Sequence, residues 1–154
     1  ICRDKKLMEE TFRYRTSSPE ETERVGEALC SSLKEGDLVA LIGELGGGKT
    51  RFVRGLAKGL GSKGFVKSPS FTIVNVYEGG RLPLYHIDLY RIGRASEFES
   101  AGLDELIYGH GVSAIEWADK APELLDECRI TVSFSYAGEF EREIEIRVKG
   151  AGKV

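Results

Sequence analysis

The amino-acid sequence predicts an α/β fold, a three-layer sandwich with a mixed, partly antiparallel sheet. Three observations carry this prediction. A short, continuous apolar run at residues 37–42 is typical of a parallel strand that is buried on both faces. Helical apolar patterns precede and follow it, at residues 17–34 and 51–60. Glycine-containing turns at residues 78–81 and 137–139 separate strand-like runs, which indicates β-hairpins and hence antiparallel pairs.

The first half of the chain supplies four elements. Residues 11–15 alternate as an edge strand does. Ser18, Pro19 and the two glutamates that follow are typical of a helix start, and this helix is expected to extend to about residue 34. The buried strand at 37–42 comes next, and the helix at 51–60 carries an apolar stripe.

The second half supplies further strands and one more helix. Residues 71–77 and 82–87 are expected to pair as a hairpin. A capping box at residues 96–99 predicts a helix that extends to about residue 107. Residues 112–116 form a second short buried strand, and residues 129–148 form a terminal hairpin.

The size of the chain, 154 residues, predicts one domain over residues 1–154. Residues 1–8 are expected to be disordered or foreign to the natural chain, with Met8 a plausible initiator. No run approaches the ~18 apolar residues that span a bilayer, and no secretory signal is visible at the start. We therefore expect a cytoplasmic protein with no membrane partner.

Charge and cysteine content exclude further classes. The net charge of −3 argues against tight autonomous binding to nucleic acid, which needs a basic patch, but it leaves open an action on RNA that partners hold. Cys2, Cys30 and Cys128 are far apart and form no Cys-x-x-Cys pair. We expect reduced or buried thiols, and neither a metal site nor a disulfide-linked partner.

The most informative segment is Gly43-Glu44-Leu45-Gly46-Gly47-Gly48-Lys49-Thr50, which has the pattern G-x-x-x-x-G-K-T between a predicted strand and a predicted helix. Its glycines allow backbone N–H groups to turn toward phosphate oxygens, and the helix start adds partial positive charge. Lys49 would reach the β- and γ-phosphates, and the Thr50 hydroxyl would bind Mg²⁺. The sequence therefore predicts a P-loop NTPase-like fold that binds a nucleoside triphosphate.

Two carboxylates follow predicted strands and could complete the site. Asp88 and Glu116 each stand at a strand end, and ligands of open α/β sheets bind outside the carboxyl ends of strands. A solvated turn or a helix cap is the alternative for either residue alone. His86 is interpreted as a satisfied core side chain. Two questions stay open: whether Trp117 walls the nucleotide pocket or fills the core, and whether Arg142 contacts phosphate.

Five segments occur together in an order that resembles the TsaE (YjeE) family. They are residues 43–50, 67–72 (Lys-Ser-Pro-Ser-Phe-Thr), 86–91 (His-Ile-Asp-Leu-Tyr-Arg), 97–102 and 115–117 (Ile-Glu-Trp). The phosphate-loop pattern alone is generic. The elements His-x-Asp-x-Tyr-Arg (86–91) and Ile-Glu-Trp (115–117), at this spacing from the phosphate loop, are far more specific.

The resemblance implies a small bacterial ATPase that converts ATP to ADP and phosphate, weakly when alone. It also implies a requirement for threonylcarbamoyladenosine modification of tRNA. By family analogy the protein acts on the TsaD–TsaB complex without performing the transfer itself, and tRNA is met only indirectly through that complex.

Carried over by position, the resemblance assigns Lys49, Asp88 and Glu116 to catalysis and Thr50 and Glu116 to Mg²⁺. The nucleotide contacts that it implies for ATP or ADP are Gly43, Leu45, Gly46, Gly47, Gly48, Lys49, Thr50, Pro19, Trp117 and Arg142.

Two alternatives stay open beside a hydrolase. A small-molecule kinase of the P-loop class needs an acceptor pocket and a lid, and only residues 91–110 could supply the lid. A nucleotide-dependent assembly module would bind ATP with little turnover. A GTP-operated switch is set aside, since Asn-Lys-x-Asp is absent and Arg91 stands where such a switch needs glycine.

Overall fold

The computed structural model describes residues 9–43, 48–67, 74–89, 105, 107 and 109–149. Some predictions therefore fall outside the described residues. These are the phosphate-loop positions Leu45, Gly46 and Gly47, the first three residues of the strand expected at 71–77, and most of the helix expected at 96–107.

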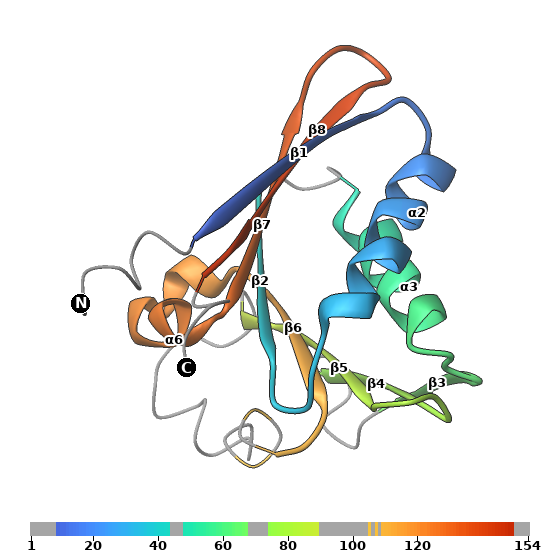
Figure 1. The fold of residues 1–154 in the computed structure, drawn as a ribbon, viewed down its shortest axis with the longest axis vertical. Helices are drawn as coiled ribbons and strands as arrows, with labels where there is room; N and C mark the ends of the chain where they lie inside the picture. The colour runs from blue at the N-terminus through green and yellow to red at the C-terminus, as the bar shows by residue number, and fades with distance from the viewer. Residues whose placement is uncertain are drawn as a thin grey trace.

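The described strands are β1 (Glu10–Thr16), β2 (Leu38–Gly43), β3 (Gly64–Lys67), β4 (Val74–Glu78), β5 (Leu84–Asp88), β6 (Val112–Glu116), β7 (Ile130–Tyr136) and β8 (Arg142–Val148). They form one sheet in the order β1-β8-β7-β2-β6-β5-β4-β3 (Figure 1). Strand β2 is parallel to β6 and β7, and β5 is parallel to β6. The other pairs are antiparallel. The predicted mixed sheet, parallel around the phosphate loop, is confirmed.

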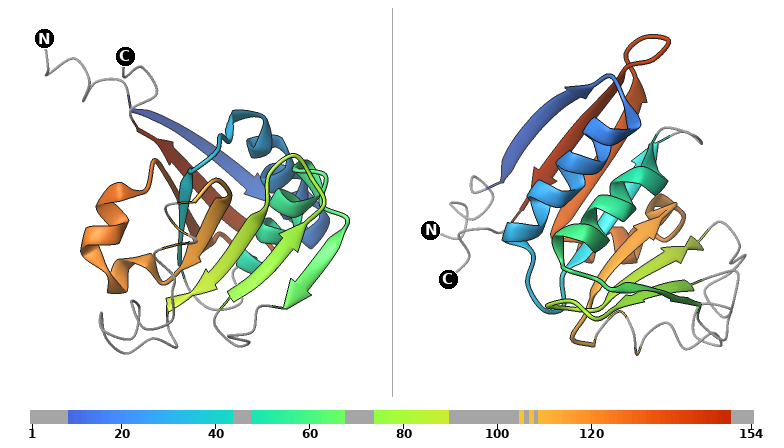
Figure 2. Two further views of the ribbon diagram at one scale, coloured as in Figure 1. Left: turned by 90° about the horizontal axis from the view of Figure 1, so that it is seen from below. Right: turned by 90° about the vertical axis from the view of Figure 1, so that its right-hand side faces the viewer.

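Helices cover both faces of the sheet and make the three layers that the sequence predicts. The helices α2 (Pro19–Leu29) and α3 (Lys49–Gly59) lie side by side on one face, and the short α6 (Pro122–Glu127) lies on the other (Figures 1 and 2). Ser18 caps α2 by accepting a hydrogen bond from the Glu21 N–H at 3.1 Å, as predicted for this start. No helix within the described residues is both long and apolar enough to cross a membrane.

Strand β2 is buried on both faces, and its side chains alternate between two hydrophobic clusters. Val39 and Leu41 pack into the cluster that contains the α2 and α3 side chains, among them Phe52. Leu38 and Ala40 pack into the other cluster, which lies on the α6 side. Burial on both faces explains why the sequence of β2 is an unbroken apolar run. The packing of β2 in both clusters also fixes the position at which the phosphate loop leaves the sheet.

The structure differs from the sequence prediction in three elements. Helix α2 ends at Leu29 and continues as the 3₁₀ turn η1 (Cys30–Ser32), short of residue 34. There Arg81 donates hydrogen bonds to the carbonyls of Cys30 and Leu33, a distant contact that a local pattern cannot indicate. Strand β3 and helix α6 were not predicted, because four and six residues are too few to establish a period.

Two of the three cysteines lie in the core as unpaired thiols. Cys30 is 2% exposed and Cys128 is fully buried, which confirms the expectation of buried thiols for these two residues. Burial raises the pKa of Cys30 to about 11 and that of Cys128 to about 12. Both thiols are therefore protonated and unreactive at neutral pH.

Candidate functional site

Two glycines fix the ends of the phosphate loop. Gly43, the last residue of β2, has φ 141°, and a Cβ at this position would lie 2.5 Å from the carbonyl oxygen of Phe134. Gly48 has φ 99° and is the N-cap of α3. A side chain is strained at both positions, so the first and last glycines of the motif define where the loop leaves the strand and enters the helix.

The N-terminus of α3 lies where the sequence predicts an anion-binding site. Helix α3 begins at Lys49, and Gly48 provides no side chain to cap it. The first backbone N–H groups of a helix lack intrahelical partners and carry partial positive charge, which suits a phosphate. Thr50, the second residue of the helix, is exposed in this first turn.

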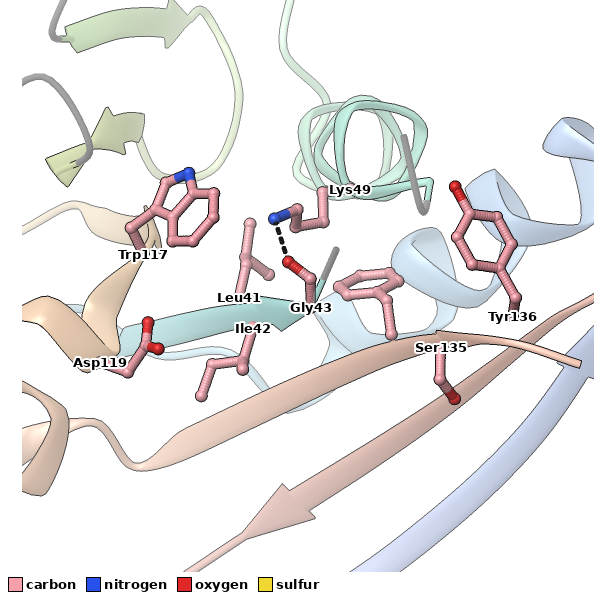
Figure 3. A pocket seen from close by; sticks show the side chains of 9 residues that line it. Leu41, Ile42, Gly43, Lys49, Trp117, Asp119, Ser135 and Tyr136 are labelled. Carbon is pink, nitrogen blue, oxygen red and sulfur yellow. Dashed lines mark hydrogen bonds between the residues drawn. The ribbon is translucent and has the colours of Figure 1, made fainter. Parts of the chain in front are cut away.

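Lys49 lies at the centre of the site. Its side chain is only 4% exposed, and its Nζ donates a 2.8 Å hydrogen bond to the Gly43 carbonyl (Figure 3). The same Nζ lies 4.0 Å from Glu116 Oε1 and 4.9 Å from the centroid of the Trp117 ring. The ammonium group is thus stabilised by a carbonyl, a carboxylate and an aromatic face.

The two predicted carboxylates come together at the carboxyl ends of parallel strands. Asp88 ends β5, Glu116 ends β6, and they are directly paired in the register. Glu116 is 15% exposed. Its burial raises the pKa of Glu116, but the hydrogen bond with His86 and the charges of His86 and Lys49 lower it more. The net pKa therefore lies below the usual value, and the group is a carboxylate at neutral pH.

His86 is a satisfied side chain, as the sequence favours, but its partner is the candidate catalytic carboxylate. His86 Nε2 lies 2.6 Å from Glu116 Oε2, and the imidazole is 12% exposed. Sequence reasoning could find His86, because it precedes Asp88 by two residues on a predicted strand. It could not find the contact, because the contact depends on the pairing of β5 with β6.

A pocket of about 640 Å³ lies over the ends of β2 and β7 (Figure 3). Trp117, on which the sequence is undecided, lines this pocket and also packs against the hydrophobic cluster on the α6 side. Its backbone is left-handed, with φ 62°, which is unusual for a bulky residue and common at functional sites. The other lining residues are Leu41, Ile42, Gly43, Lys49, Asp119, Phe134, Ser135 and Tyr136.

Asp119 and Tyr136 line the pocket but were not among the predicted site residues. Neither belongs to a motif: Asp119 lies in the turn η3 (Ala118–Lys120), and Tyr136 is the last residue of β7. The available signal is their position, since Tyr136 ends β7 and Asp119 lies three residues after the end of β6.

Six of the predicted residues that the structure describes lie outside the pocket lining: Pro19, Gly48, Thr50, Asp88, Glu116 and Arg142. Arg142 reaches its margin, because its guanidinium lies 4.3 Å above the ring of Tyr136, its partner in the register. Pro19 is the first residue of α2 and follows strand β1, whose Thr16 is also paired with Arg142. The segment before α2 and the start of β8 are therefore neighbours.

The donor chemistry suits a magnesium–nucleotide complex better than an autonomous metal site. Within the described ranges, no three His, Cys, Asp or Glu side chains could together hold a metal ion. Hydroxyl and carboxylate oxygens of Thr50, Asp88 and Glu116 are ligands that Mg²⁺ accepts, and the ion commonly takes its other ligands from phosphates and water. These residues fit Mg²⁺ that enters with a polyphosphate.

Comparison with known proteins gives one consistent result. A family model described as threonylcarbamoyl adenosine biosynthesis protein TsaE matches residues 16–144. A Bacillus subtilis protein named tRNA threonylcarbamoyladenosine biosynthesis protein TsaE is 44% identical over 139 residues, which are 90% of this chain and 87% of that protein. A Treponema pallidum protein of the same name is 42% identical over 135 residues, covering 88% and 99%. The crystal structure of Bacillus subtilis YdiB superimposes with a TM-score of 0.74 at 39% identity, covering 92% of this chain and 88% of that one.

Proposed function

The chain belongs to the TsaE family, and from this premise we propose that it is a magnesium-dependent ATPase required for threonylcarbamoyladenosine modification of tRNA. The relatives are named for that biosynthesis. The observation that carries the ATPase proposal is the position of Lys49 Nζ, 2.8 Å from the Gly43 carbonyl and 4.0 Å from Glu116 Oε1 at the ends of parallel strands.

Lys49 and the start of α3 bind the phosphates. The lysine exchanges its contacts with Gly43 and Glu116 for phosphate oxygens, while the backbone N–H groups of the first helical turn bind the same chain. In hydrolysis a water oxygen bonds to the γ-phosphorus as the bond to the β–γ bridging oxygen breaks. Lys49 then stabilises the charge that grows on that oxygen and on the γ-phosphate.

Thr50 and Glu116 are the residues that would hold Mg²⁺. When bound, the ion supplies further neutralisation of phosphate charge. Asp88, paired in register with Glu116, orients the attacking water or the waters around the ion. Both carboxylates stand at the carboxyl ends of neighbouring parallel strands.

We expect slow turnover in the isolated protein. No arginine is among the described residues that line the pocket, so none there can stabilise transition-state charge as an arginine finger does. The TsaD–TsaB complex is the proposed partner that supplies such a group or orders the site, and ATP hydrolysis would reset that complex between turnovers. Accelerations of ~10³ have precedent in other phosphate-loop enzymes.

The binding step is tested with Lys49→Ala. The single tryptophan of the chain, Trp117, lies 4.9 Å from Lys49 Nζ and provides an intrinsic fluorescence signal for nucleotide titrations. We expect Lys49→Ala to weaken ATP binding by about 10- to 100-fold, the size of a lost charge-assisted contact. Lys58→Ala, which removes an exposed lysine from the other end of α3, is the matched control and should bind normally.

The catalytic step is tested with Glu116→Gln and by phosphate release. We expect this variant to bind ATP but to release phosphate at least about 100-fold more slowly, with or without TsaD–TsaB. Turnover that depends on an added alcohol or nucleoside would point to a kinase. ATP binding that promotes assembly with TsaD–TsaB while Glu116→Gln supports the modification at the normal rate would instead favour an assembly module.

A further inference from the structure

His86 and Glu116 meet because of the strand register. Across the β5–β6 pair the partner of His86 is Ala114, so Glu116 is its diagonal neighbour two residues further along. Diagonal neighbours are within reach of long side chains. Residues 86, 88 and 116 share the face of the sheet that carries α3, because Leu84 and Ala114, at the same parity, belong to the core cluster on that face.

The two oxygens of the Glu116 carboxylate have different neighbours. Oε2 lies 2.6 Å from His86 Nε2, whereas Oε1 lies 4.0 Å from Lys49 Nζ. Because an ionised carboxylate can only accept, His86 Nε2 is the donor of this hydrogen bond. The last torsion of a glutamate is broad and has no steep rotamer preference, so a bond to one oxygen determines where the other oxygen points.

The surroundings of Glu116 make such a restraint useful. Asp88 is directly opposite Glu116 in the register, and like charges in that position repel. The carboxylate is also largely buried, at 15% exposure, which is unfavourable unless hydrogen bonds compensate. A donor on Oε2 offsets the burial without occupying the oxygen that faces the lysine.

We propose that His86 is a positioning residue that fixes the rotation of Glu116 and so aims Oε1 at the place where a magnesium–triphosphate complex binds. The inference rests on the proposed function and assigns a role to a side chain that does not itself touch nucleotide or metal. It predicts that His86 affects the magnesium-dependent part of nucleotide binding and acts through Glu116 alone.

The test is a comparison of variants by calorimetry with ADP, in Mg²⁺ and in EDTA. His86→Leu removes the donor. His86→Asn is closer in shape but cannot place an N–H at the position of Nε2, whereas His86→Gln can. Mg²⁺ should increase the affinity for ADP, and we expect this increase to be about tenfold smaller in His86→Leu and His86→Asn than in the natural protein. A loss of this size is typical for groups that orient metal ligands. Affinity in EDTA should not change, and Gln should retain most of the gain.

A second comparison separates positioning from a general structural role. In a Glu116→Gln background His86→Leu should cause no further loss of magnesium-dependent affinity. Thermal unfolding of each variant checks the fold, and His86→Asn carries the same prediction where His86→Leu does not fold.

Equal losses in Mg²⁺ and EDTA, or a further loss in the Glu116→Gln background, would show that His86 only supports the fold and would overturn the inference. Unchanged binding by His86→Leu and His86→Asn would also overturn it. Those outcomes leave the proposed function intact. A natural-sequence protein that binds no adenine nucleotide under either condition would overturn both.

Discussion

Glu23 on α2 accepts hydrogen bonds from two cations of α3, Arg51 Nε and Lys58 Nζ, each at 3.0 Å. The hydrogen bonds from Lys58 and then Arg51 lower the pKa of Glu23 below its usual value. A group whose pKa is lower in the folded state contributes stability above its unfolded pKa, about 4.3, and that contribution is lost as the pH falls through the folded pKa.

Glu23→Gln should therefore reduce the free energy of unfolding by about 1 kcal/mol at pH 7, and the difference from the natural protein should vanish in acid. Urea unfolding at pH 7 and at about pH 3 measures both values. Glu20→Gln is the control, because Glu20 is 65% exposed and lies 3.8 Å from Arg51. If the difference in free energy of unfolding between the natural protein and Glu23→Gln were the same at about pH 3 as at pH 7, the ionised Glu23 would not be the source of this stability.

At the residue scale the sequence indicates chemistry better than contacts. The positions of Lys49 at a helix start and of Asp88 and Glu116 at strand ends can be predicted, because a phosphate-loop motif and strand-end carboxylates are local patterns. The contact of His86 with Glu116 and the position of Tyr136 at the pocket cannot, because each depends on which strands pair and in which register. Hydrophobic periodicity carries no information about that register between distant segments.

At the scale of elements, helices α2 and α3 pack closely against each other. A Cβ added at Gly55 of α3 would lie 2.0 Å from the carbonyl oxygen of Glu23, and one added at Gly26 of α2 would lie 2.4 Å from that of Phe52. The backbones of the two helices are therefore in direct contact, and this contact holds α3, which begins at Lys49 at the end of the phosphate-loop motif, in place.

Gly55→Ala should lower the free energy of unfolding by about 1–3 kcal/mol, since overpacking outweighs the better helix propensity of alanine. Chemical denaturation measures the change. Gly138→Ala in the β7–β8 turn is the matched control, because the nearest atom to its Cβ would be the movable Glu141 carboxylate oxygen at 3.3 Å. A neutral Gly55→Ala would mean that the helices can separate at little cost.

Elements differ in how far local sequence determines them. Helix α3 could be predicted because its eleven residues show the helical period, and strand β2 could be predicted because it is an unbroken apolar run directly before the phosphate-loop motif. The end of α2 could not, because Arg81 bonds the carbonyls of Cys30 and Leu33 from another part of the chain. Strand β3 has only four residues and exists through its pairing with β4.

At the scale of the whole molecule, the ion pair of Arg129 with Asp37 joins segments that are distant in sequence. Arg129, just before β7, donates two hydrogen bonds to Asp37, just before β2, at 2.9 and 2.7 Å, and a third to the Ser32 carbonyl at 2.8 Å. Asp37 is 10% exposed and also accepts from the Lys34 N–H. The pair ties the parallel strands β2 and β7 to the end of the α2 region.

Arg129→Leu should lower the free energy of unfolding by about 2–3 kcal/mol, because it leaves a largely buried carboxylate without its cation. Adding Asp37→Asn should recover part of this loss, since the uncompensated charge is removed. Arg13→Leu is the control: it breaks a 2.9 Å pair with Glu145, but Arg13 is 67% exposed, so we expect less than about 1 kcal/mol. Equal effects at both sites would refute the role of burial.

Strand β1 lies at one edge of the sheet, and its described partner is β8, with Glu10 opposite Val148. During synthesis on a ribosome β1 emerges before the other described strands, yet it can pair with β8 only after all of them have emerged. The pairing of β1 with β8 closes the long stretch of chain between them. This closure lowers the conformational entropy of the chain and therefore makes the pairing slow. The nascent chain therefore carries β1, with the exposed aromatic side chains of Phe12 and Tyr14, without its partner strand until β8 has been synthesised.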